Sequence, residues 1–136
     1  MRHRYPCPMR WGDMDAFGHV NNVHLARYLE QARVDLLFSG GHAGSDTMAE
    51  GVVLAELTIK YTAPLVYRPE PVLVDVWVTR IGNSAFDFAY EVHDLDGPTY
   101  AQATSVQVPY DLKAQRPRRL TEGEQEFLQR LYEPAP

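Results

Sequence analysis

The hydrophobic period of this chain changes once, from a helical repeat to strand alternation, and this change constrains the fold more than any other feature. Over residues 23–39 apolar side chains recur at helical spacing, and the Gly40-Gly41 pair that follows is typical of a helix end. At about 1.5 Å per residue, the helix is expected to be roughly 25 Å long. Its apolar face carries Leu25, Leu29, Ala32 and Leu36, widened by Ala26, Tyr28 and Leu37.

Alternation of apolar and polar residues follows the helix and predicts four long strands. An Asp96-Gly97 pair between the last two is a strong hairpin signal. Strands of this length span roughly 30 Å, so a long antiparallel sheet can cover the helix along its whole length. The pattern predicts an α+β domain, with one early helix against a sheet built mainly from later hairpins. The four strands are expected over residues 53–61, 72–79, 86–93 and 100–108.

Weaker signals place the segments around these elements. A short strand is expected within residues 1–10, at a sheet edge, because Pro6 and Pro8 cannot donate to a strand ladder. Loops are expected over residues 11–21 and 40–51, the second with one turn at 46–49.

Capping signals mark the helix starts. Asn21 or Asn22 is expected to cap the long helix. A short terminal helix is predicted over residues 120–131, because Thr121 and Glu124 have the spacing of a capping box.

Length and composition exclude several classes of protein. At 136 residues the chain suits one domain, expected over residues 1–136, and 45% hydrophobic content is ordinary for a globular protein. One cysteine excludes a disulfide framework and a zinc ribbon, and the histidines share no ligand spacing, so no metal site is expected. A net charge of −5 argues against nucleic acid as a partner. Without an apolar run of about 20 residues or a signal-peptide pattern, the chain is expected to be cytoplasmic, with no membrane partner.

Residues capable of chemistry are concentrated in the loop before the long helix. Asp15, Gly18, His19 and Asn22 lie within eight residues. A helix start offers unpaired N–H groups that can stabilise an oxyanion, and a nearby aspartate can act as base or nucleophile on a carbonyl. On spacing alone another interpretation stays open, in which Asp15 caps a turn and His19 packs on the surface. Asp13 is expected to fix the loop by accepting backbone hydrogen bonds.

Two motifs in this region resemble one known family. The run from Arg10 to Asn22, R-W-G-D-M-D-A-F-G-H-V-N-N, and the helix motif Tyr28-Leu-Glu-Gln-Ala-Arg33 are similar to the hotdog-fold thioesterases, in the branch of 4-hydroxybenzoyl-CoA thioesterase. Residues 59–65 and 80–84 also have counterparts in that family. The resemblance implies the hotdog fold, a long antiparallel sheet wrapped around one central helix. It also implies an acyl-CoA thioesterase, which hydrolyses an acyl-CoA thioester to a carboxylic acid and CoA without a cofactor.

The resemblance further implies a role for each residue of the loop. The family's catalytic carboxylate falls on Asp15, as a general base or as a nucleophile that forms a transient anhydride. His19 matches a histidine implicated in catalysis or in orienting groups, and N–H groups around Gly18 and the helix start would form the oxyanion site. Asn22 either holds the water or caps the helix. Phe17 departs from the pattern of the plant enzymes, which carry asparagine there, so a second polar partner is missing.

Polar and basic residues later in the chain are candidates for binding CoA. Arg80, Asn83 and Ser84 match a turn that touches the nucleotide or pantetheine end of CoA in relatives, and an ordinary hairpin is the alternative. A basic cluster either meets the phosphates of CoA or forms a solvated tail, and it comprises Lys113, Arg116, Arg118 and Arg119.

The resemblance also bears on assembly and on two other activities. In hotdog relatives two sheets join and the acyl site forms between subunits, which implies a homodimer or homotetramer here. The strand over residues 53–61 contains no Pro or Gly that would blunt an exposed edge, so self-pairing is compatible with the sequence. A non-catalytic acyl-CoA-binding hotdog domain and a hotdog hydratase or dehydratase stay open as alternatives.

Overall fold

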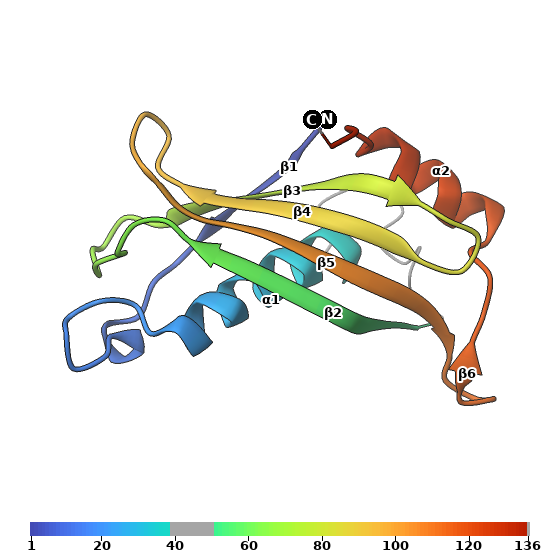
Figure 1. The fold of residues 1–136 in the computed structure, drawn as a ribbon, viewed down its shortest axis with the longest axis horizontal. Helices are drawn as coiled ribbons and strands as arrows, with labels where there is room; N and C mark the ends of the chain where they lie inside the picture. The colour runs from blue at the N-terminus through green and yellow to red at the C-terminus, as the bar shows by residue number, and fades with distance from the viewer. Residues whose placement is uncertain (39–50, 136) are drawn as a thin grey trace.

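The computed structural model describes residues 1–38 and 51–135, and they form one sheet with a long helix against one face (Figure 1). The two chain ends lie side by side, where the Met1 ammonium group donates a hydrogen bond of 3.0 Å to the Arg130 carbonyl oxygen. In chain order the elements are β1 (His3–Cys7), the 3-10 turn η1 (Trp11–Asp13), α1 (Asn22–Phe38), β2 (Val52–Tyr61), β3 (Val72–Ile81), β4 (Phe86–His93), β5 (Thr99–Asp111), β6 (Arg116–Pro117) and α2 (Glu122–Arg130).

These bounds confirm the predicted helices and strands to within a few residues. The short first strand, β1, lies at a sheet edge and contains Pro6, as predicted. The sequence did not predict η1 or the two-residue β6, because elements this short carry no hydrophobic period. The predicted loop over 40–51 with its turn at 46–49, and the Gly40-Gly41 helix end, fall outside the described residues except for Gly51.

Antiparallel pairing joins five strands in the order β1-β3-β4-β5-β2, and the short β6 pairs with β5 outside this order. This order leaves β2 at one edge, as the self-pairing argument requires. A bulge at Ala55 shifts the register of β2 against β5, because Leu54 pairs with Gln107 and Glu56 with Val106. Bulges of this kind are common on edge strands, where they increase the local twist.

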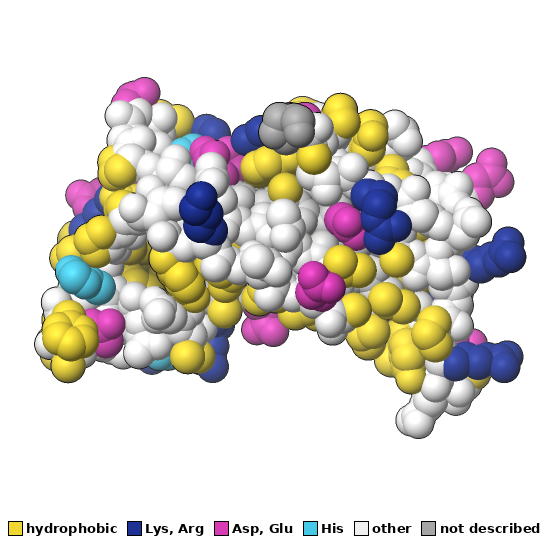
Figure 2. Space-filling view, viewed as in Figure 1, with side chains coloured by type: hydrophobic (Ala, Val, Ile, Leu, Met, Phe, Trp, Pro, Cys, Tyr) yellow, Lys and Arg dark blue, Asp and Glu magenta, His cyan; other side chains and the backbone are white. Residues whose placement is uncertain are grey.

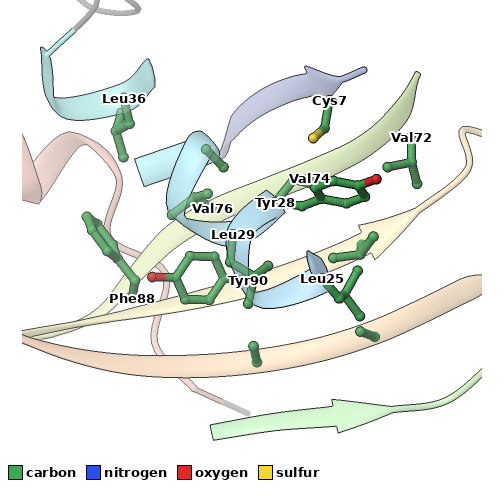
Figure 3. Packing of buried hydrophobic residues seen from close by; sticks show 14 of the residues in the cluster. Cys7, Leu25, Tyr28, Leu29, Leu36, Val72, Val74, Val76, Phe88 and Tyr90 are labelled. Carbon is green, nitrogen blue, oxygen red and sulfur yellow. The ribbon is translucent and has the colours of Figure 1, made fainter. Parts of the chain in front are cut away.

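The core lies between α1 and the inner face of the sheet. Figure 3 shows side chains of α1 pointing toward the strands that carry Val74, Val76 and Tyr90. The predicted apolar stripe of the helix is confirmed, since Leu25, Leu29, Ala32 and Leu36 are each at most 4% exposed. Opposite them lie fully or almost fully buried side chains of β3 and β4, namely Val72, Val74, Val76, Val78, Phe86, Phe88 and Tyr90.

A buried ion pair attaches α2 to the rest of the fold. The predicted capping box is confirmed, because Thr121 and Glu124 each accept the other's backbone N–H. Glu124 is 1% exposed, and Arg118 donates to both of its carboxylate oxygens at 2.8 Å. Arg118 therefore belongs neither to a solvated tail nor to a free phosphate site, which corrects both interpretations of this member of the basic cluster.

The outer face of the sheet carries charges of both signs. In the view of Figure 2, acidic and basic side chains are interspersed, and the basic ones stand apart rather than forming a continuous stripe. No helix among the described residues is long and apolar enough to cross a membrane.

The Arg118–Glu124 pair predicts an acid-sensitive contribution to stability. Burial alone would raise the pKa of Glu124, but hydrogen bonds from Arg118 and Thr121 outweigh it and hold the pKa below its ordinary value. Glu124→Gln is expected to lower the free energy of unfolding at pH 7 by about 2 kcal/mol. Because the folded-state pKa is the lower one, this contribution is present above the unfolded-state pKa of about 4.3 and is lost as the pH falls through the folded-state value.

Urea unfolding of the wild type and of Glu124→Gln, at neutral and at acid pH, measures this contribution. The difference in free energy of unfolding between the two proteins should be smaller at acid pH than at pH 7. Glu126→Gln, at an exposed position of the same helix, is the control. If Glu124→Gln and Glu126→Gln lower the free energy of unfolding equally at pH 7, the Arg118–Glu124 pair does not make this contribution.

Candidate functional site

A tight hairpin, residues 14–20, immediately precedes α1. Met14 and Val20 form an antiparallel bridge, and the Asp15 N–H donates to the His19 carbonyl oxygen at 2.8 Å. The Gly18 N–H closes the turn by donating to the Asp15 carbonyl oxygen at 3.1 Å. Gly18 has a φ of +78°, a left-handed conformation that side chains with a Cβ rarely adopt, so glycine suits the position.

The Asp15 side chain is held by the backbone of its own hairpin. Its Oδ1 atom accepts the N–H groups of Phe17 at 2.9 Å and of His19 at 3.2 Å. Its Oδ2 atom accepts no hydrogen bond from a described residue. One oxygen therefore fixes the direction of a half-buried carboxylate, and the other is available to a ligand.

The helix start lies directly after this hairpin. Asn21, rather than Asn22, caps α1, because its side-chain oxygen accepts the Val23 N–H at 2.8 Å. Asn22 is the first helical residue, and its carbonyl oxygen accepts the hydroxyl of Tyr61 at 3.2 Å. The first turn of a helix has several N–H groups without an intrahelical acceptor, and the Asn21 side chain bonds only one of them. The positive end of the helix dipole lies at this turn, on the same cavity as Asp15.

These segments line a cavity of about 330 Å³ that is open to solvent. A backbone hydrogen bond of 2.7 Å, from the Val20 N–H to the Leu65 carbonyl oxygen, joins the hairpin to the segment that follows β2. The cavity lies near the end of the sheet where β2 terminates (Figure 1). It is lined by Asp15, His19 and Val20 of the hairpin, Asn22 and Leu25 of α1, and Tyr61, Thr62, Ala63, Pro64 and Leu65.

The structure thus brings together Asp15, His19 and Asn22, with Gly18 at the hairpin turn. The His19 imidazole makes no hydrogen bond with a described residue, so both of its nitrogens are available to a ligand. Residues 61–65 of the same chain form the opposite wall of the cavity, although the sequence-based predictions did not place them in the site. The family motif over residues 59–65 was the signal that could have found it.

The second group of predicted site residues lies elsewhere in this chain. Arg80 lies near the end of β3, and Asn83 and Ser84 belong to the β3–β4 turn that follows. This end of the sheet is opposite to the hairpin of residues 14–20 (Figure 1). β3 alone is ten residues long, or about 33 Å. Arg80 donates to both carboxylate oxygens of Asp87, at 3.0 and 2.8 Å. One chain therefore does not bring these residues to Asp15.

Neither Asp15 nor His19 belongs to a metal-binding cluster in the described part of the chain, where no three acidic, histidine or cysteine side chains converge. What the arrangement offers chemically is a fixed carboxylate, a helix N-terminus and an apolar wall around one cavity. Such a site can hold a carbonyl group, stabilise negative charge on its oxygen, and deliver a nucleophile or a base to its carbon.

Comparison with known proteins is consistent with this chemistry. The chain matches the model of the thioesterase-like superfamily over residues 9–131. No curated protein sequence matches it.

Three solved structures are similar to this chain over most of its length. The PA2801 protein of Pseudomonas aeruginosa, a candidate thioesterase, is 31% identical, with a TM-score of 0.78 over 91% of this chain and 95% of that one. A candidate acyl-CoA thioesterase from Xanthomonas campestris is 36% identical, with a TM-score of 0.67 over 80% of this chain and 92% of that one. A thioesterase from Thermus thermophilus, complexed with coenzyme A and zinc, is 26% identical, with a TM-score of 0.76 over 94% of this chain and 92% of that one. The shared antiparallel sheet over a long helix confirms the hotdog fold.

Proposed function

Because the chain belongs to the thioesterase-like superfamily, we propose that it hydrolyses an acyl-CoA thioester to a carboxylic acid and free CoA. The observation that carries the proposal is the Asp15 carboxylate, fixed through one oxygen and lining a cavity at the start of α1. The Thermus thermophilus relative is complexed with CoA, which supports CoA as the carrier of the acyl group.

Asp15 supplies the reactive carboxylate, by one of two routes. As a general base, it takes a proton from water while the water oxygen bonds to the thioester carbon. As a nucleophile, it bonds to that carbon itself and gives an anhydride, which water then hydrolyses. In both routes the carbon–sulfur bond breaks, and the CoA thiolate leaves and takes up a proton.

Groups around Asp15 stabilise and orient the reacting atoms. Negative charge develops on the thioester oxygen, and N–H groups at the first turn of α1 stabilise it. The N–H groups of Phe17, Gly18 and His19 are already bonded to Asp15, so the oxyanion site expected around Gly18 is proposed at the helix start alone. His19 orients the water or donates to the carbonyl, and Asn22, freed from capping by Asn21, holds the water. A thioester is already activated, so these steps use only this chain's own groups and water.

Asn83 and Ser84 are proposed to contact the nucleotide or pantetheine end of CoA. Both side chains are exposed, whereas the Arg80 guanidinium is already paired with Asp87. Arg80 therefore supports the turn and reaches a CoA phosphate only by leaving that pair.

Two subunits are proposed to share the site, as a homodimer or a homotetramer of two such dimers. β2 is an edge strand that exposes apolar side chains, among them Val53, Leu54 and Tyr61. Exposed strand edges pair readily, and pairing of β2 with its own copy gives a two-fold dimer. Since Tyr61 ends β2 and also lines the cavity, a partner strand would lie beside the site.

The carboxylate prediction concerns Asp15→Asn. An amide oxygen can still accept the Phe17 and His19 N–H groups, so the hairpin should keep its shape while the charge is lost. Turnover of a panel of acyl-CoA substrates, followed with a thiol-detecting reagent, is expected to fall by about 10²-fold or more.

Asp96→Asn, in the exposed β4–β5 turn, is the matched control and should retain wild-type turnover. Activity of Asp15→Asn within about threefold of wild type would remove Asp15 from the mechanism.

Binding of acyl-CoA by the wild type without release of thiol would favour a non-catalytic binding domain. Addition of water to an unsaturated acyl-CoA, again without thiol release, would favour a hydratase.

A separate prediction concerns the imidazole of His19. His19→Ala keeps the backbone N–H that Asp15 accepts, so only the ring is lost. Turnover is expected to fall roughly 10²-fold, as for a positioned proton-transfer group. If thermal unfolding changes and turnover does not, His19 only packs on the surface.

The shared site predicts a concentration-dependent activity. Light scattering on the purified protein is expected to give at least twice the 15.5 kDa mass of one chain, and turnover per chain should fall when dilution separates the subunits. A monomer with full turnover would rule out the shared site.

A further inference from the structure

A second carboxylate, Asp13, lies next to the site without lining the cavity. Asp13 is 4% exposed. Its Oδ2 atom accepts the hydroxyl of Tyr28 at 2.7 Å, and its Oδ1 atom lies 3.3 Å from Nδ1 of His24. That nitrogen is buried and has no aligned hydrogen bond within the described residues. Asp13 thus holds the loop as predicted, but through side chains of α1 rather than through backbone N–H groups.

The backbone of Asp13 also forms the base of the Asp15 hairpin. Its carbonyl oxygen accepts the Asn21 N–H at 2.9 Å, and its own N–H donates to the Arg10 carbonyl oxygen at 3.0 Å. Asp15 follows only two residues later. Any shift of Asp13 relative to α1 is therefore passed directly to the hairpin that carries Asp15.

The partners of the Asp13 carboxylate lie on one face of α1. His24 and Tyr28 are four residues apart, so they are neighbours on the helix surface. Figure 3 shows the Tyr28 ring between α1 and the strands that carry Cys7, Val72 and Val74. Burial and the hydrogen bond to Asp13 raise the pKa of Tyr28, so its hydroxyl stays protonated and donates at neutral pH.

We propose that Asp13 and Tyr28 are positioning residues: the bond between them sets where the Asp15 carboxylate stands relative to the first turn of α1. The His24 imidazole lies beside the second oxygen of Asp13, with its Nδ1 atom 3.3 Å away. This inference rests on the proposed function, in which Asp15 must face a carbonyl whose oxygen is bound at the same helix start. Misplacement of a reacting group by about 1 Å can cost up to 10²-fold in rate, so one hydroxyl remote from the substrate is able to control turnover.

The chain offers a matched control for the loss of this hydroxyl. Tyr100 is also buried, and its hydroxyl donates to the carboxylate of Asp94 at 2.6 Å. That carboxylate is bound to Arg68 and is joined neither to the hairpin nor to α1. Tyr28→Phe and Tyr100→Phe therefore each remove a hydrogen bond from a tyrosine hydroxyl to an aspartate, the first at the proposed support of Asp15 and the second elsewhere. Tyr100→Phe also removes the acceptor of a 3.3 Å hydrogen bond from Arg68.

The experiment measures kcat, KM, the pH profile of kcat and thermal unfolding for both variants. Tyr28→Phe is expected to lower kcat about tenfold or more and to change KM less than about threefold, because substrate contacts remain while the carboxylate is displaced. The pH profile should keep its shape, since Asp15 is still the reacting group. Tyr100→Phe is expected to keep kcat within about twofold of wild type.

A pair of Asp13 variants tests the same bond from its other side. Asp13→Asn keeps an oxygen that accepts the Tyr28 hydroxyl, whereas Asp13→Ala removes it. In folded samples, Asp13→Asn is expected to retain a kcat about tenfold higher than that of Asp13→Ala. If Tyr28→Phe does not fold, this comparison still tests whether the hydrogen bond between Asp13 and Tyr28 positions Asp15.

Two results would overturn the inference and leave the proposed function intact: equal kcat values for Tyr28→Phe and Tyr100→Phe, or equal kcat values for the two folded Asp13 variants. In either case Asp15→Asn would remain inactive. Full activity of Asp15→Asn, by contrast, would remove Asp15 from the mechanism, and absence of thiol release by the wild type would overturn the proposed function itself. The two failures are therefore distinguishable in one set of assays.

Discussion

Burial of one face of α1 against the sheet is the interaction on which the rest of the structure depends. Leu25, Leu29 and Leu36 are at most 4% exposed, opposite valines of β3 that are fully buried. Burying one such side chain stabilises the fold by about 1.5–3 kcal/mol. Because α1 and the long strands have similar lengths, this contact aligns the helix along the sheet. It thereby fixes the end of the sheet at which the helix begins.

The position of the helix start in turn determines the candidate site. The hairpin of residues 14–20 folds back beside the first turn of α1, and the bond from Val20 to Leu65 joins it to the chain beyond β2. The Asp15 carboxylate is thus held by its own hairpin, and the hairpin is joined to the segment after the edge strand. Support from several rigid elements holds a reacting group more accurately than a free loop does.

Local sequence predicted most of the fold, because periodicity and capping act over a few residues. The helix and four long strands, and the Thr121–Glu124 capping box, are confirmed. Predictions failed where a side chain finds a partner distant in sequence. The basic run predicts a solvated tail or a phosphate site for Arg118, yet Arg118 pairs with the buried Glu124 and donates to the Gly51 carbonyl oxygen. A basic run looks the same in sequence whether its side chains are solvated or paired.

The sequence by itself determined the elements and the group of Asp15, Gly18, His19 and Asn22 at the helix start, because these residues are neighbours along the chain. Only the tertiary structure decided the opposite wall of the cavity, the pairing of Asp13 with Tyr28, and the separation of Arg80 from Asp15. The physical reason is that these relations depend on strand order and register and on the placement of the helix on the sheet. An alternating pattern assigns side chains to a face, but it does not say which strand lies beside which.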